Sequence, residues 1–197
     1  MIWSPLSVAE TAALFAECRA PWWLAGGYAI ELIVGQSFRT HHDIDVMMLR
    51  RDQKHLRTVL RGWDLCVADP PGSGKLRRCD PDKTIEAPLH DLWCRRTPGS
   101  PWALQVMLDE AEGEEWISRR DHRIRRNVDS IGVWTTHGIP VLAPEIELYY
   151  KAKNFADKDQ MDFAAVLPLL APERRTWLDA ALALSLPEHP WRKALHA

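Results

Sequence analysis

Two aspartates separated by one residue, Asp43 and Asp45, lie in an apolar stretch of strand-like character. On a β-strand such residues point to the same side, so their carboxylates raise each other's pKa unless a cation neutralises them. Hard carboxylate oxygens in a small group suit Mg²⁺, which keeps some of its waters and bridges to substrate phosphates. The alternative is an acidic strand end that forms a salt bridge to Arg39 or is capped by His42. Taken alone, the aspartate pair favours this second interpretation.

A glycine pair, Gly26-Gly27, precedes the aspartates and follows an apolar run that predicts a short buried strand over 22–25. The glycines lead into a predicted helix over 28–34, so they present backbone N–H groups at a helix N-terminus, where phosphate oxygens bind. Because glycine has no Cβ, the backbone can also approach a ligand closely. If the strand over 22–25 lies beside the strand predicted over 43–49, the turn faces the aspartates across a gap that a triphosphate fits.

The stretch from Trp22 to Val46, with its glycine pair, short helix and aspartate pair, resembles the minimal nucleotidyltransferases of the DNA polymerase β superfamily. The most similar group is the aminoglycoside 2″-nucleotidyltransferase and lincosamide nucleotidyltransferase-like proteins. The resemblance implies an enzyme that moves a nucleoside monophosphate from an NTP, with ATP the expected donor, to a hydroxyl group of a small molecule. An aminoglycoside- or lincosamide-like acceptor would make the reaction one of antibiotic resistance. The resemblance also implies that Asp43 and Asp45 bind Mg²⁺ and that Gly26 contacts the phosphates.

Three further side chains are candidates for binding the nucleotide. Lys151 lies on a predicted helix face that two tyrosines make partly buried, from which its ammonium group would neutralise the triphosphate. A solvated helix face is the alternative for this lysine. Arg39 and His42 precede the aspartates and are expected to contact phosphate or to support the loop, and His42 is equally well explained as a structural hydrogen-bonding residue.

The resemblance implies a third carboxylate from a later strand, acting as a metal ligand or as the base for the acceptor hydroxyl. Asp91 is preferred because it lies mid-strand between apolar neighbours, whereas Asp109 comes at the end of its predicted strand. Gln105 occupies the central position where an acid is expected, and an amide cannot act as a base. This departure leaves open a non-catalytic NTP-binding or antitoxin-like protein on the same fold. Transfer to protein or tRNA is a further alternative, for which the basic cluster over 119–126 would provide contacts.

The elements that must position these residues predict an α/β protein of the α+β type, in which a small mixed sheet is flanked by helices. Residues 1–142 are expected to form the nucleotidyltransferase-like domain, and residues 143–197, with their helical periodicity, a C-terminal helical subdomain. A capping box at Ser7 and a glycine stop at Gly35 predict two helix ends. The acceptor is expected in a cleft between the two parts.

The composition excludes several classes of partner. The 197-residue chain has a formal net charge of −2, which argues against a long nucleic acid or an anionic membrane. No apolar run reaches about 18 residues and no secretory signal pattern is present, so a cytoplasmic location is expected. The four cysteines lack compact metal-ligand spacing, which argues against zinc. The segment over 70–75 lacks the spacing of a Walker phosphate loop and predicts a turn.

Overall fold

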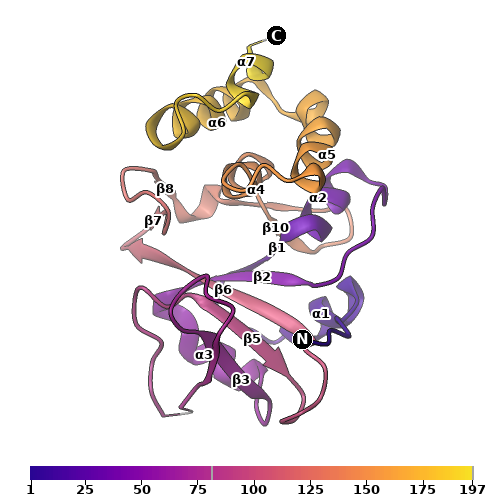
Figure 1. Ribbon diagram of the computed structural model, residues 1–197, viewed down its shortest axis with the longest axis vertical. Helices are drawn as coiled ribbons and strands as arrows, with labels where there is room; N and C mark the ends of the chain where they lie inside the picture. The colour runs from indigo at the N-terminus through magenta and orange to yellow at the C-terminus, as the bar shows by residue number, and fades with distance from the viewer. Residues whose placement is uncertain (81, 197) are drawn as a thin grey trace.

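The computed structural model describes residues 1–80 and 82–196. Within these residues a ten-stranded mixed sheet has helices packed against both of its faces (Figure 1). The strands are β1 (Trp22–Ala25), β2 (Asp45–Leu49), β3 (Asp64–Ala68), β4 (Leu76–Arg78), β5 (Asp91–Arg95), β6 (Leu104–Glu112), β7 (Glu115–Ile117), β8 (Arg125–Asn127), β9 (Gly132–Trp134) and β10 (Pro140–Leu142). The α-helices are α1 (Val8–Phe15), α2 (Gly26–Val34), α3 (Gln53–Val59), α4 (Pro144–Lys151), α5 (Asp157–Val166), α6 (Pro172–Ser185) and α7 (Trp191–Leu195).

The main path of the sheet runs in the order β4-β3-β5-β6-β2-β1-β10-β9, and β7 and β8 extend it from β6. Strand β2 is antiparallel to β1 and parallel to β6, so the sheet is mixed and the predicted fold class is confirmed. The sheet has more strands than the small sheet that the sequence suggested. The register most important for function pairs Ala25, at the end of β1, with Asp45, at the start of β2.

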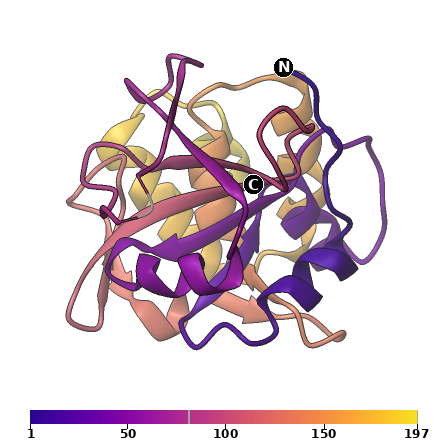
Figure 2. The ribbon, with the colours of Figure 1, turned by 90° about the horizontal axis from the view of Figure 1, so that it is seen from below.

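Side chains of β2 alternate between two hydrophobic cores, one on each face of the sheet. Val46 and Met48 pack in the core that includes residues of α1 and α3. Met47 and Leu49 pack in the other core, together with residues of α4 to α7. Figure 2 shows α1 and α3 in front of the sheet and the C-terminal helices behind it. Asp45 precedes Met47 by two residues, so its side chain lies on the face that the C-terminal helices cover.

Two helix ends that the sequence predicted are confirmed, because Ser7 caps α1 and Gly35 ends α2 with a φ of 81°. Two other boundaries differ from the prediction. Helix α2 begins at Gly26, so the glycine pair forms the first residues of the helix itself. Strand β2 begins at Asp45, because its partner β1 ends at the residue paired with it, and Asp43 therefore lies in the preceding loop.

Strands β4, β7 and β8 and helix α7 were not predicted from the sequence. The charged stretch around β7 and β8 forms a small ladder in which Trp116 is fully buried. On the outer side, Arg125 forms ion pairs of 2.9 Å with both Glu112 and Glu115. Cross-strand pairing of opposite charges therefore stabilises strands whose composition alone indicates an exposed segment.

The C-terminal helices share a core with the sheet. That core joins Met47 and Leu49 of β2 to Ile146 of α4 and Phe163 of α5. The division of the chain between residues 142 and 143 stays a prediction. None of the helices in the described part of the chain is long and apolar enough to cross a membrane.

Candidate active site

The glycine turn lies directly against the second aspartate. Gly26 has a φ of +69°, a conformation that favours glycine, and a Cβ at this position would collide with the Asp45 carboxylate. The contact follows from the register, because Ala25 pairs with Asp45 and the chain turns into α2 at the next residue. The sheet thus places the N-terminus of α2 beside the predicted metal-binding aspartate.

The second glycine makes room for the loop that leads to the aspartates. A Cβ at Gly27 would collide with the side chains of Arg39 and His41. His41 packs against Tyr28, with ring centroids 4.2 Å apart, and its Nε2 lies 3.1 Å from Oε1 of Glu31. The loop therefore folds back over the first turn of α2.

The predicted nucleotide ligand His42 is exposed, in contrast to the buried side chain of its neighbour His41. The structure places it in the same loop as the aspartates, just before Asp43. Its contact with a nucleotide stays a prediction.

Asp45 is half-buried and surrounded by acidic groups. Burial is the largest cause of the rise of its pKa to about 8, and the charge of Asp43 is the next. Glu147 on α4 and Asp91 on β5 raise this pKa as well, whereas the ammonium group of Lys151 lowers it. The fold therefore brings carboxylates from the loop, the sheet and the C-terminal helices to one place that a cation would stabilise.

Asp91 lies on the half-exposed side of β5, where it faces the same region as Asp45. Gln105 on β6 donates a hydrogen bond of 2.6 Å from Nε2 to Oδ1 of Asp91. Gln105 also pairs in register with Asp45, so the amide stands between the two acids. The glutamine, which stands where the sequence suggested an acid, thus orients the carboxylate of Asp91 on the neighbouring strand.

Asp109, the alternative third acid, is fully buried and engaged by other side chains. Trp116 Nε1 and the Tyr150 hydroxyl each donate to its Oδ2 at 2.8 Å, and Arg119 pairs with its Oδ1. It lies four residues along β6 from Gln105, which is about 13 Å on a strand. Its carboxylate acts as a structural anchor between β6 and α4.

Arginines of the basic cluster over 119–126 also form hydrogen bonds and ion pairs with other parts of the protein. Arg120 donates to the carbonyl oxygens of Tyr149 and Tyr150 at 2.6 and 2.5 Å, and Arg126 pairs with buried Glu145. These arginines connect the sheet to the C-terminal helices. The guanidinium groups of Arg120 and Arg126 are therefore used within the protein.

Glu147 is a buried acid of the site that the sequence analysis missed. Burial raises its pKa, while the ammonium of Lys151 and a hydrogen bond from the backbone N–H of Gly26 act in the opposite direction. Its Oε1 lies 3.8 Å from Nζ of Lys151, at the i,i+4 spacing of a helix. That spacing was the available signal, but on a helix it usually marks a solvated ion pair.

The two predicted phosphate-binding cations meet at one carboxylate. Lys151 Nζ lies 2.9 Å from Oδ2 of Asp162, and Arg39 donates to both oxygens of the same group at 2.8 and 2.9 Å. Burial lowers the pKa of Lys151, but the surrounding carboxylates, Glu147 and Asp162 foremost, more than offset this, so the pKa is raised and the side chain is charged. The charge of Lys151 also lowers the pKa of Asp45, whereas the side chain of Arg39 is directed towards α5.

The donor set fits a hard divalent cation. No cluster of three or more histidine, cysteine or acidic side chains with the geometry of a metal cage occurs in the described ranges 1–80 and 82–196. Mg²⁺ does not need such a cage, since it typically binds one or two carboxylates together with substrate phosphates and water. Asp43 and Asp45 are the residues that would hold it, and a bound cation would favour the ionised form of Asp45, whose pKa burial and the charge of Asp43 raise.

The sequence model of one protein family, the aminoglycoside-2″-adenylyltransferases, matches residues 7–166. The chain belongs to this family. The match includes the glycine pair, both aspartates and Lys151, and it confirms the resemblance predicted from the sequence. The protein is a nucleotidyltransferase.

Solved structures show the same fold. The crystal structure of ANT(2″)-Ia in complex with adenylyl-2″-tobramycin is 14% identical, covers 90% of this chain and 95% of its own, and has a TM-score of 0.57. The lincosamide antibiotic adenylyltransferase LnuA, with lincomycin bound, is 13% identical, covers 86% of this chain and 100% of its own, and has a TM-score of 0.57. No curated protein matches the chain.

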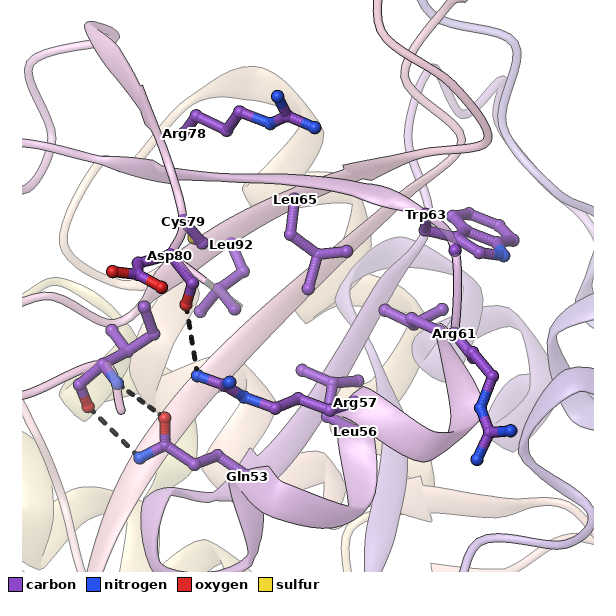
Figure 3. A pocket seen from close by; sticks show the side chains of 13 residues that line it. Gln53, Leu56, Arg57, Arg61, Trp63, Leu65, Arg78, Cys79, Asp80 and Leu92 are labelled. Atoms are coloured by element: carbon purple, nitrogen blue, oxygen red, sulfur yellow. Dashed lines mark hydrogen bonds between the residues drawn. The ribbon is translucent and has the colours of Figure 1, made fainter. Parts of the chain in front are cut away.

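The nucleotidyltransferase also has a cavity of about 630 Å³ between α3 and strands β3 to β5 (Figure 3). Leu56, Leu65 and Leu92 form part of its apolar wall, and none of the residues that line it is a predicted site residue. Leu92 and Asp91 are consecutive on β5, so their side chains point to opposite faces of the sheet. This cavity is therefore separate from the acidic site.

Proposed function

We propose that the protein transfers a nucleoside monophosphate from a Mg²⁺-bound NTP, with ATP the expected donor, to a hydroxyl group of an aminoglycoside-like acceptor. The observation that supports this most strongly is the contact of Asp45 with the glycine turn at the N-terminus of α2. Phosphates bound at this helix N-terminus would lie beside the carboxylate that we expect to bind the metal. Bound Mg²⁺ would supply the positive charge that offsets the triphosphate and the two aspartates.

Each residue has a distinct part in this reaction. The backbone N–H groups of the first turn of α2, other than that of Gly26, which donates to Glu147, and the ammonium group of Lys151 bind and orient the phosphates. Asp91 accepts the proton of the acceptor hydroxyl, whose oxygen then forms a bond to the α-phosphorus. The bond between that phosphorus and the bridging oxygen breaks, and pyrophosphate leaves with the electron pair. Gln105 keeps the Asp91 carboxylate turned towards the site through its hydrogen bond.

The charge around the site favours a cationic acceptor. Asp91, Trp93 and Gln105 lie on the half-exposed sides of β5 and β6, so this side of the site is accessible. The carboxylate of Asp91 on this rim attracts the ammonium groups of an acceptor. A polyamine sugar therefore suits the site better than an acidic or neutral acceptor, in agreement with the name of the family.

A pyrophosphate-release assay tests this proposal. The protein is incubated with Mg²⁺ and each of the four NTPs, with and without aminoglycosides, lincosamides and a neutral sugar, and the acceptor is then analysed by mass spectrometry. We expect release that depends on Mg²⁺ and an aminoglycoside, a product heavier by one nucleoside monophosphate, and no release by Asp45→Asn. Release with none of the acceptors, or with lincosamides only, would contradict the proposed acceptor class.

A further inference from the structure

The buried carboxylate of Asp162, on α5, binds both Arg39 and Lys151, the two cations that the sequence predicted to contact the phosphates. Asp162 has no exposed surface, and both of its oxygens accept hydrogen bonds from Arg39, at 2.8 Å from Nε and 2.9 Å from Nη2. The Lys151 ammonium lies 2.9 Å from Oδ2. Burial alone would raise the pKa of Asp162, but the hydrogen bonds from Arg39 and Lys151 lower it, so the group is a carboxylate.

Arg39 lies in the loop that leads to Asp43 and Asp45, the aspartates expected to bind the metal. Glu31 on α2 fixes this loop by accepting hydrogen bonds from the backbone N–H groups of Phe38 at 2.9 Å and Arg39 at 3.1 Å. The side chain of Arg39 then crosses to α5, a partner 123 residues further along the chain. Through Asp162, the loop that precedes Asp43 is connected to the lysine on α4.

The position of Lys151 depends on this connection. Three carboxylates lie within 4 Å of its ammonium group: Asp162 at 2.9 Å, Glu147 at 3.8 Å and Asp159 at 3.9 Å. Only the first distance is that of a hydrogen-bonded ion pair. Because the planar fork of Arg39 binds both oxygens of Asp162, that carboxylate does not depend on Lys151 alone for its counter-charge.

From this geometry, and on the basis of the proposed function, we infer that Asp162 and Arg39 are a positioning pair that directs Lys151 at the triphosphate. Neither side chain needs to touch the nucleotide. Asp162 sets the place of the ammonium group, and Arg39 fixes the place and the charge of Asp162. Because Arg39 and Lys151 both bind Asp162, the pair also fixes the loop relative to the lysine. The distance between the aspartates that would bind the metal and the ammonium group that would bind the phosphates is thereby kept constant.

Epistasis between Asp162 and Lys151 tests the inference. The affinity of Mg²⁺ and a non-hydrolysable ATP analogue is measured by calorimetry for the wild type, Asp162→Asn, Lys151→Met and the double variant. Loss of one charged hydrogen bond predicts about tenfold weaker binding by Asp162→Asn. In the Lys151→Met background, Asp162→Asn should produce no further loss, because the lysine through which it acts is gone. Arg39→Lys, which keeps the charge but not the fork, should weaken binding less than Arg39→Gln.

Glu145 provides a matched control for the loss of a buried carboxylate. It is on α4, has no exposed surface, and pairs with Arg126 and Arg174 away from the acids of the site. Glu145→Gln should lower the melting temperature, yet leave the affinity of the folded protein unchanged. A similar loss of affinity in Glu145→Gln would mean that the loss in Asp162→Asn comes from general destabilisation of the fold, and it would overturn the inference.

The remaining outcomes separate this inference from the proposed function. Unchanged affinity in Asp162→Asn, or an equal loss with and without Lys151, overturns the positioning role while the wild type still binds the nucleotide. A wild type that does not bind Mg²⁺-ATP analogue overturns both. If Asp162→Asn does not fold, the Arg39→Lys and Arg39→Gln series, with and without Lys151→Met, supplies the same comparison.

Discussion

Replacing Asp45 with asparagine should stabilise the metal-free protein at neutral pH. The pKa of Asp45 is about 8 in the fold, against an ordinary value of 3.8. Between these values the folded protein holds a proton that the unfolded chain releases, so the free energy of unfolding falls as the pH rises from about 4 to about 8. Below about pH 4 both states are protonated and the cost disappears. Asparagine does not ionise, and it therefore removes the cost.

The size of the effect follows from the pKa shift. From 3.8 to pH 7 is about 3 units at about 1.4 kcal/mol each, which gives an upper limit of about 4 kcal/mol. Asp45 is only half-buried, so solvent screening reduces the expected gain to about 1–2 kcal/mol. For a chain of 197 residues this gain corresponds to a rise in Tm of about 2–8 °C.

Thermal and urea unfolding in EDTA measures this gain for the wild type and Asp45→Asn at about pH 5, 7 and 8.5. The difference should grow with pH and level off above about pH 8, where Asp45 ionises in the folded state as well. A substitution that lowers stability would refute the reasoning, since it would mean that Asp45 forms a stabilising salt bridge. A gain that is the same at every pH would show that the ionisation of Asp45 is not its cause.

Three further substitutions test other parts of the site. Asp91→Asn should lower kcat by about 10²–10⁴-fold while the affinity for the Mg²⁺-bound ATP analogue changes little, since the base acts in the transition state; an active variant in a rapid-quench assay would remove it from the mechanism. Gly26→Ala places a Cβ against the Asp45 carboxylate and forces a residue with a side chain to φ +69°, so calorimetry should show nucleotide affinity reduced at least about tenfold, and unchanged binding would contradict the contact. Asp109→Asn leaves Arg119 buried without its counter-charge and should cost about 3–5 kcal/mol in urea unfolding, whereas a loss below about 1 kcal/mol would mean that Asp109 is not a structural anchor.

The local parts of the site could be predicted from the sequence. A glycine pair before a helix and an aspartate pair in an apolar run are close together in the chain, and one antiparallel strand pairing is enough to bring them into contact. Asp91 lies on the half-exposed side of β5, as expected for an acid between apolar residues on a strand, and its role as the third acid stays a prediction. The mixed sheet followed from the same strand patterns.

The long-range parts could not be predicted. The pairing of Arg39 with Asp162 joins residues 123 positions apart, and each of them taken alone resembles an ordinary surface charge. Glu147 is buried and accepts a hydrogen bond from the backbone of Gly26 in α2, a tertiary contact that helical periodicity does not reveal. Strands β7 and β8 were missed because paired charges stabilise them, whereas an isolated charged stretch is usually exposed.

A crystal structure with Mg²⁺ and a non-hydrolysable ATP analogue tests the central claim most directly, namely that the glycine turn and the aspartate pair form one nucleotide site. We predict phosphates at the N-terminus of α2, the metal bound by Asp43 and Asp45, and the Lys151 ammonium on a phosphate oxygen. An analogue bound elsewhere, for example in the cavity beside α3, with no metal at the aspartates, would contradict the claim.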